Sequence, residues 1–141
     1  MKYYLDTCIW INLFKKEVNI ITNKEYWKIT QIFLDKVLNQ NDQIFYSGII
    51  LREIQIKLGD DRLKDKSEFF YDLGIIKIEL IQEDKILARK LESKYNFEIS
   101  FYDLLHLSIC KRLDFILVTR DRQLINIAKE NDVKVIKPEW L

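Results

Sequence analysis

Four acidic residues lie where predicted strands give way to predicted helices: Asp6, Glu53, Asp103 and Asp121. Asp6 directly follows the apolar run of residues 3–5, and Asp121 follows the run of residues 115–119 with one residue between. The carboxyl ends of parallel strands share one edge of a sheet, where ligands bind. Four carboxylates gathered there would repel one another unless a positive charge, most simply a divalent metal ion, sat among them.

Each acid also has an ordinary structural explanation. Asp121 could cap the following helix, and Asp103 lies three residues after Ser100, which is the spacing of a capping box. Glu53 could be a solvated residue within a helix. Asp6 is harder to explain in this way, because a carboxylate directly after a buried strand is poorly placed for free solvation. Considered together at one sheet edge, the four acids favour a functional site.

The elements that must position these acids can be read from the hydrophobic pattern. Apolar runs predict strands at residues 2–6, 43–46, 75–80, 115–119 and 133–136. Helical spacing and capping residues predict helices at 7–16, 24–40, 47–58, 65–73, 83–95, 100–113 and 122–131. Gly59-Asp60-Asp61 should end the third of these helices.

Strands that are apolar throughout and alternate with helices are typical of a parallel sheet covered on both faces. We therefore predict an α/β fold: a three-layer α/β/α arrangement with a central, mainly parallel five-stranded sheet. No internal repeat or linker-like stretch interrupts the chain, so a single domain over residues 1–141 is expected.

Composition limits the possible function classes. A net charge of +1 is too small for nucleic-acid binding by bulk charge, so any contact with a polyanion must be a local patch. Cys8 and Cys110 have no CxxC spacing and no companion histidines, so we expect no disulfide framework and a cytoplasmic location. We also expect no targeting leader and no membrane span.

Four segments of the chain match a family pattern: Leu5-Asp6-Thr7, Ile50-Leu51-Arg52-Glu53-Ile54, Ser100-Phe101-Tyr102-Asp103-Leu104-Leu105-His106-Leu107 and Leu117-Val118-Thr119-Arg120-Asp121. Each segment alone is a weak signal, but their order, spacing and strand–helix context form a fairly specific set. The chain resembles the PIN-domain nucleases over its whole length. It is most similar to the small stand-alone members found as VapC-type toxins of toxin–antitoxin pairs.

The resemblance implies metal-dependent cleavage of single-stranded or structured RNA. It gives the family's acidic roles to four positions and the hydroxyl position near the metal to a fifth: Asp6, Glu53, Asp103, Asp121 and Thr119. Stand-alone relatives commonly form dimers and are inhibited by a partner protein. A homodimer and an antitoxin partner are therefore plausible.

The chemistry of phosphodiester hydrolysis agrees with this assignment. The reaction needs an activated water and stabilisation of the leaving oxygen, and one or two divalent ions can supply both. A site of carboxylates without a Cys or His cluster favours Mg²⁺ or Mn²⁺ over Zn²⁺. We expect Asp6 and Asp103 to be the principal metal ligands. Asp121 would hold a second ion or an ordered water, and Glu53 would act directly or through water.

Other residues near the acids have two interpretations each. Arg120 and Arg122 flank Asp121 and could bind RNA phosphates, or they could be a solvated helix start. His106 shares a helix face with Asp103 and could approach the site, although a packed, hydrogen-bonded histidine is the favoured interpretation. For Cys8 a small buried thiol is favoured.

Two further function classes compete with a toxin nuclease. A non-catalytic PIN-like module could hold RNA or a protein, although no acidic position of the pattern is missing. A housekeeping RNA-processing nuclease would carry the same residues as a toxin. A phosphorylation-responsive receiver domain is disfavoured, because such domains need an acidic pair after the first strand and Asp6 stands alone there.

Overall fold

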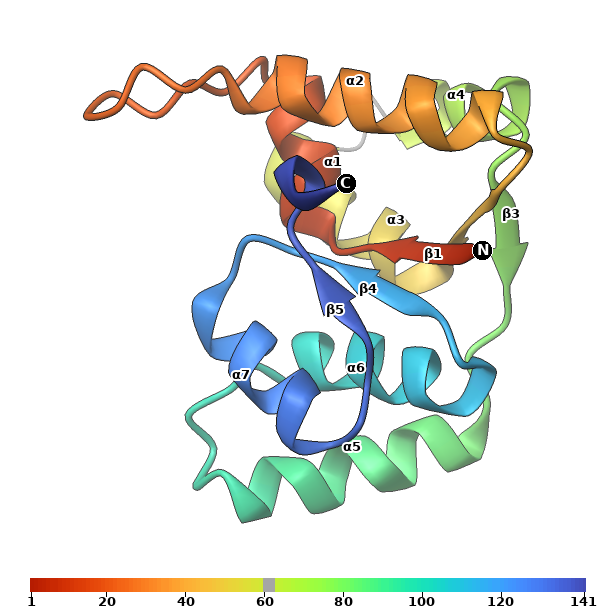
Figure 1. Ribbon diagram of the computed structural model, residues 1–141. Coiled ribbons are helices and arrows are strands. Elements are labelled where there is room, and N and C mark those ends of the chain that lie inside the picture. Colours follow the sequence, from red (N-terminus) through yellow and green to blue (C-terminus); the bar gives the residue numbers. More distant parts are fainter. Residues whose placement is uncertain (60–62) are drawn as a thin grey trace.

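A five-stranded sheet lies at the centre of the protein (Figure 1). The computed structural model describes residues 1–59 and 63–141. The strands are β1 (Lys2–Leu5), β2 (Gln43–Ser47), β3 (Ile76–Ile78), β4 (Ile116–Val118) and β5 (Val135–Ile136). They are arranged in the order β3-β2-β1-β4-β5, and every neighbouring pair is parallel. The predicted parallel sheet is confirmed, and its two edge strands are shorter than predicted.

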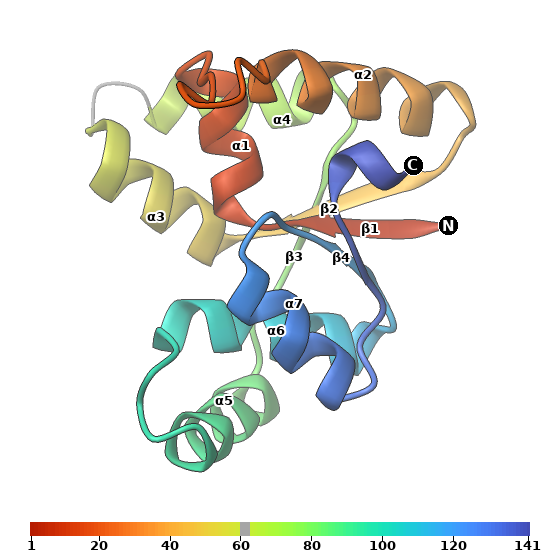
Figure 2. The same ribbon diagram turned by 60° about the vertical axis from the view of Figure 1, so that its left-hand side comes forward.

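Helices cover both faces of this sheet (Figures 1 and 2). On one face lie α1 (Thr7–Phe14), α2 (Tyr26–Asn39) and α4 (Leu63–Asp72), and α3 (Gly48–Leu58) packs against α1 and α4. On the other face lie α5 (Gln82–Lys94), α6 (Phe101–Leu113) and α7 (Arg122–Glu130). After β5, a short 3-10 helix, η2 (Pro138–Trp140), returns to the first face and packs against α2. The predicted three-layer α/β/α fold is thus confirmed.

The connection between α1 and α2 differs from the prediction. Helix α1 ends at Phe14, two residues early, and Lys16 adopts a positive φ of 51°. Val18 then pairs with Glu25 in a protruding hairpin, whose turn is held by Asn19 Oδ1 accepting from the backbone of residues 21 and 22. Because this hairpin uses residues through Glu25, α2 begins at residue 26 instead of residue 24.

Of the three residues predicted to end α3, the structure describes the first, Gly59. Gly59 follows the helix with a φ of +91°, a conformation that glycine adopts without a steric cost. Asp60 and Asp61, which belong to the same predicted turn, lie outside the described residues.

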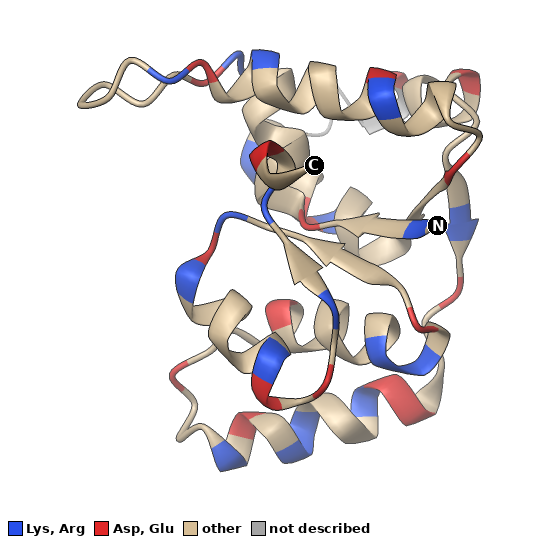
Figure 3. Ribbon diagram, viewed as in Figure 1, with Lys and Arg blue, Asp and Glu red and all other residues tan. Residues whose placement is uncertain are grey.

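The core is rich in aromatic side chains packed between the sheet and its helices. The largest fully buried residues include Tyr3, Tyr4, Trp10, Phe33 and Phe70. Burying a side chain of this kind contributes roughly 2–3 kcal/mol, so the sheet and α1 form a firm support for the residues at their junction. Charged residues lie mainly on helices and connections, where both signs are intermixed (Figure 3). Within the described chain, no helix has the length and apolar character needed to cross a membrane.

The register of β1 and β4 determines where the predicted acids meet. Leu5 pairs with Val118, so the next residues, Asp6 and Thr119, leave the two central strands side by side. The backbone N–H of Asp6 donates to the carbonyl of Val118 at 2.9 Å, which extends the pairing one step beyond the strand. Two strands at the middle of the sheet therefore deliver a carboxylate and a hydroxyl to the same edge.

Candidate active site

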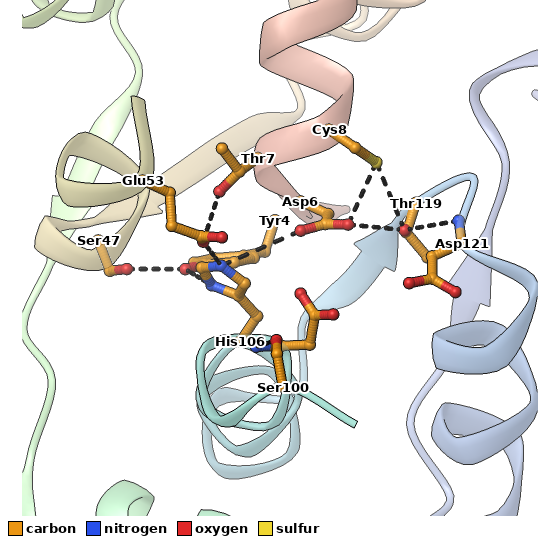
Figure 4. Close-up of polar contacts among 11 residues, drawn as sticks. Tyr4, Asp6, Thr7, Cys8, Ser47, Glu53, Ser100, His106, Thr119 and Asp121 are labelled. Atoms are coloured by element: carbon orange, nitrogen blue, oxygen red, sulfur yellow. Dashed lines mark hydrogen bonds and ion pairs between the residues drawn. The ribbon is translucent and has the colours of Figure 1, made fainter. Parts of the chain in front are cut away.

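Asp6 is a buried carboxylate at the junction of β1 and α1, with a relative exposure of 4% (Figure 4). Its Oδ2 accepts hydrogen bonds from the Thr119 hydroxyl at 2.8 Å and from the Cys8 thiol at 3.2 Å. Although Asp6 occupies the N-cap position of α1, its side chain makes no capping hydrogen bond. A buried charge is costly unless it is hydrogen-bonded or paired, so these donors hold Asp6 in one orientation.

Glu53 projects from α3 toward the same region and is not the solvated residue that its helical position would allow. Only 14% of its side chain is exposed. Its Oε1 accepts from Thr7 Oγ1 at 2.7 Å and from His106 Nε2 at 2.5 Å. Burial raises the pKa of Glu53, but the hydrogen bond and charge of His106 and the bond from Thr7 outweigh burial and lower that pKa. Glu53 is therefore stabilised as a carboxylate.

His106 is fully buried on α6 and links Glu53 to the sheet. Its Nδ1 lies 2.7 Å from the Tyr4 hydroxyl, which lies 2.7 Å from the Ser47 hydroxyl. Burial lowers the pKa of His106, but the hydrogen bond and charge of Glu53, with the charges of other acids nearby, raise it overall. The structure places His106 as a packed, hydrogen-bonded histidine, and it also places it beside two of the predicted acids: Nε2 is 4.0 Å from Asp6 Oδ1.

Asp103 lies in the first turn of α6, whose N-cap Ser100 accepts from the Asp103 backbone N–H at 3.1 Å. Its carboxylate makes no hydrogen bond or ion pair with the described residues. Burial and the negative charge of Asp6 raise the pKa of Asp103 to about 6; His106 opposes this rise, while Glu53 and Asp121 add to it. All four predicted acids therefore interact electrostatically at one point of the fold.

Asp121 caps the following helix, as its position suggested, and it is also linked to Asp6. Its Oδ1 caps α7 by accepting from the backbone N–H groups of Gln123 and Leu124. Its own backbone N–H donates to Thr119 Oγ1 at 3.1 Å, so Thr119 joins Asp121 to Asp6. Because Asp121 is exposed, its other carboxylate oxygen remains accessible from solvent.

The two predicted RNA-binding arginines have different surroundings. Arg120 donates to Asn12 Oδ1 and to both carboxylate oxygens of Glu139, and its guanidinium lies 4.1 Å from the centre of the Tyr26 ring. Arg122 is exposed and makes no hydrogen bond or ion pair with any described residue. Arg122 is therefore free to meet a phosphate, whereas Arg120 is held by contacts within the protein.

Several side chains of this site were not assigned a role from the sequence. Thr7 donates to Glu53, and Tyr4 and Ser47 continue the polar chain behind His106. Tyr4 lies within a strand whose apolar pattern indicates only burial, and Ser47 is predicted at the start of a helix but is the last residue of β2. Thr7 directly follows Asp6, and this adjacency is the sequence feature that could have identified Thr7 as a residue of the site.

The donor set fits a hard divalent cation. The four acids offer carboxylate oxygens, and neither Asp103 nor Glu53 Oε2 has a hydrogen-bond donor among the described residues. Oxygen donors of this kind are the preferred ligands of Mg²⁺ and Mn²⁺. In the described residues no three His, Cys, Asp or Glu side chains are already drawn together in metal-binding geometry.

Comparisons with known proteins agree with this fold. The structure is similar to VapBC-1 from nontypeable Haemophilus influenzae, with a TM-score of 0.70, 18% identity and 99% of each chain covered. It is similar to VapBC2 from Rickettsia felis, solved bound to a promoter DNA fragment, with a TM-score of 0.68, 17% identity and coverage of 97% of this chain and 98% of that one. It is also similar to FitAcB from Neisseria gonorrhoeae, with a TM-score of 0.64, 18% identity and full coverage of both chains.

Among curated proteins no sequence matches this chain. The family model described as the PIN domain matches residues 3–130, which is most of the chain and includes all four acids. The chain therefore belongs to the PIN-domain family.

Proposed function

We propose that this protein is a metal-dependent endoribonuclease that hydrolyses RNA phosphodiester bonds. The observation that carries the proposal is the convergence of four carboxylates from four different elements: Asp6, Glu53, Asp103 and Asp121. Burial, together with the charges of the other three acids, raises the pKa of Asp103 to about 6. Proteins rarely gather acids at such a cost to stability without a function for them.

We further propose Mg²⁺ or Mn²⁺ as the cofactor, with Asp6, Asp103 and Asp121 as its ligands. A bound divalent ion would supply an activated water and neutralise charge on the leaving oxygen. Thr119 orients Asp6 by donating to Oδ2, and it fixes the start of α7 by accepting from the backbone of Asp121. Glu53 offers its Oε2 to the cation or to an ordered water.

RNA is the proposed substrate, and we propose that Arg122 binds its phosphates, because this arginine is exposed. A guanidinium without an internal partner can form a bidentate contact with a phosphate at little cost. Arg120 would contribute to RNA binding only by giving up its contacts with Glu139 or by acting through the local positive charge.

The biological role we favour is that of a toxin in a toxin–antitoxin pair. The similar structures include VapBC proteins and a toxin–antitoxin complex from Klebsiella pneumoniae. An antitoxin partner, a homodimer and a cytoplasmic location follow as parts of this proposal. A housekeeping RNA-processing nuclease would use the same site, and the genomic neighbour of the coding sequence distinguishes the two roles.

The test is cleavage of a labelled single-stranded RNA by purified protein. We expect cutting with Mn²⁺ or Mg²⁺ and none in EDTA. Asp6→Asn should lose at least about 100-fold in rate, because it removes the most buried charge of the set. Asp132→Asn is the matched control, since Asp132 is an Asp of positive φ outside the site and asparagine suits that backbone. Metal-independent cutting, or full activity in Asp6→Asn, would contradict the proposal.

A further inference from the structure

A chain of polar side chains runs through the interior behind the acidic site (Figure 4). It passes from Ser47 on β2 to Tyr4 on β1, to His106 on α6 and then to Glu53 on α3, with successive distances of 2.7, 2.7 and 2.5 Å. Ser47, Tyr4 and His106 are fully buried. The sheet is thus connected to one acidic residue of the site by uninterrupted hydrogen bonds.

The direction of these bonds is largely determined by their chemistry. The Glu53 carboxylate can only accept, so His106 Nε2 carries a proton and donates to it. On the other side of the ring, the Tyr4 hydroxyl can either donate to Nδ1 or accept from it. In each case Tyr4 and Ser47 can still satisfy one another, so the buried ring keeps both of its partners whatever its protonation state.

The two donors to Glu53 converge on the same oxygen. His106 Nε2 and Thr7 Oγ1 both contact Oε1, and Oε2 has no hydrogen-bond partner among the described residues. Packing of Glu53 alone does not require both donors to contact the same carboxylate oxygen. A carboxylate held through one oxygen keeps its orientation while the second oxygen remains available to a ligand.

We propose that His106 is a positioning residue, which holds Glu53 through Oε1 so that Oε2 is left to engage a divalent cation or its water. Tyr4 and Ser47 set the orientation of the imidazole ring. The inference rests on the proposed metal-dependent function and deepens it, because it gives the buried histidine a role in the metal site. The four acids alone do not explain why a histidine is buried beside them.

The decisive comparison is between two amides at position 106. In His106→Gln the side-chain amide nitrogen falls near the place of Nε2 and can still donate to Glu53. In His106→Asn the shorter amide falls near Nδ1 and keeps only the contact with Tyr4. Removing an outer partner of a metal ligand typically costs about 10- to 100-fold in metal affinity. We expect Mn²⁺ affinity, measured by electron paramagnetic resonance of free Mn²⁺, to fall about tenfold in His106→Asn and much less in His106→Gln.

A double-mutant cycle with Glu53→Gln identifies the residue through which His106 acts. If His106 acts through the Glu53 carboxylate, His106→Asn should weaken Mn²⁺ binding in the wild-type background and add little in the Glu53→Gln background. A purely structural histidine would instead lower the melting temperature equally in both backgrounds and leave Mn²⁺ affinity unchanged. That result, or equal Mn²⁺ affinities for the Gln and Asn variants, overturns the inference.

The outcomes separate this inference from the proposed function. If the wild-type protein shows no Asp6-dependent Mn²⁺ binding, the proposed function is wrong and the inference falls with it. If it binds Mn²⁺ but positions 53 and 106 are uncoupled, only the inference is wrong.

Tyr4→Phe provides a test that remains readable if substitutions at His106 prevent folding. It removes the hydroxyl that fixes Nδ1 but leaves the imidazole and Glu53 in place, so a weakening of Mn²⁺ binding by roughly two- to fivefold is expected, less than for the direct partner. Tyr3→Phe is its matched control, because Tyr3 is the neighbouring buried tyrosine of β1 and, among the described residues, its hydroxyl hydrogen-bonds to Met1 alone. Equal Mn²⁺ affinities in Tyr4→Phe and Tyr3→Phe would count against the inference.

Discussion

The two sides of the acidic site are built in opposite ways. On the α3 side, Glu53 is largely but not fully buried, receives two hydrogen bonds on one oxygen and has a lowered pKa. On the α6 side, Asp103 has no side-chain hydrogen bond to the described residues and a pKa raised to about 6. The carboxylates have the same charge, and their different hydrogen-bond partners account for the contrast.

The contrast indicates which side responds to a ligand. The Glu53 carboxylate is already stabilised by its hydrogen bonds, so a bound cation would add little to its stability. Its fixed orientation would instead favour binding of the cation. Asp103 is destabilised as an anion by burial and by the charge of Asp6, so a cation beside it would offset both. We therefore expect substitutions on the two sides to affect activity alike but stability in opposite directions.

The largest expected effect on activity is at Asp103. Asp103→Asn removes a proposed metal ligand, and we expect RNA cleavage in Mn²⁺ to fall by about 100-fold or more, since the ion stabilises the transition state directly. The rate should be measured under single-turnover conditions so that product release does not mask the chemical step. Near-normal cleavage would show that Asp103 is not a ligand.

A second effect is the pH dependence of metal binding. Asp103 must lose its proton to bind a cation, and its pKa in the metal-free protein is about 6. Mn²⁺ affinity should therefore be level above that pH and fall by about tenfold per pH unit below it. Calorimetric titration between pH 5 and 8 checks this. A profile that stays flat down to pH 5 would show that the proton on Asp103 does not compete with the metal.

A smaller effect is expected at Thr119, which joins the two central strands at the site. Thr119→Val keeps the shape but removes the donor to Asp6 and the acceptor for the Asp121 backbone. Leaving a buried carboxylate short of a donor costs about 1–3 kcal/mol, so the melting temperature should drop measurably. Thr119→Ser, which keeps the hydroxyl, should be close to wild type. Equal melting temperatures for the Val and Ser variants would rule out this role for the hydroxyl.

The smallest effect separates the two arginines. Arg122→Ala should weaken RNA binding a few-fold and reduce the salt dependence of binding by about one phosphate contact, without a change in stability. Arg120→Ala should instead lower stability, because it removes contacts with Glu139, Asn12 and Tyr26. Binding of RNA in EDTA at several salt concentrations tests both. A loss of stability in Arg122→Ala would contradict the assigned difference.

The fold and the acids were predictable from the sequence because both depend on local pattern. Apolar runs predicted the parallel strands, and strand ends predicted the edge near which Asp6 and Asp121 lie. Asp103 follows the connection from α5 to α6, so no strand end marks its position. The environment of Glu53 was not predictable, since it depends on a histidine 53 residues away on another helix. The contact of Arg120 with Glu139 joins residues 19 apart across β5, and the strand pattern contains no sign of it.

Burial and the negative charges of the other acids destabilise the Asp103 carboxylate in the metal-free site, and the stability of Asp103→Asn in EDTA tests this most directly. The folded protein binds the Asp103 proton more tightly than the unfolded chain, whose Asp pKa is near 3.8. Stability is therefore lost as pH rises from about 4 to 6, and the penalty is full above that window. Asparagine has no such penalty.

We predict that Asp103→Asn is more stable than wild type by about 1–3 kcal/mol at pH 7.5 in EDTA, and that the difference disappears below about pH 4. Added Mn²⁺ should raise the wild-type melting temperature and leave that of the variant nearly unchanged. A variant that is less stable than wild type in EDTA at pH 7.5, or that gains as much from Mn²⁺, would contradict the account.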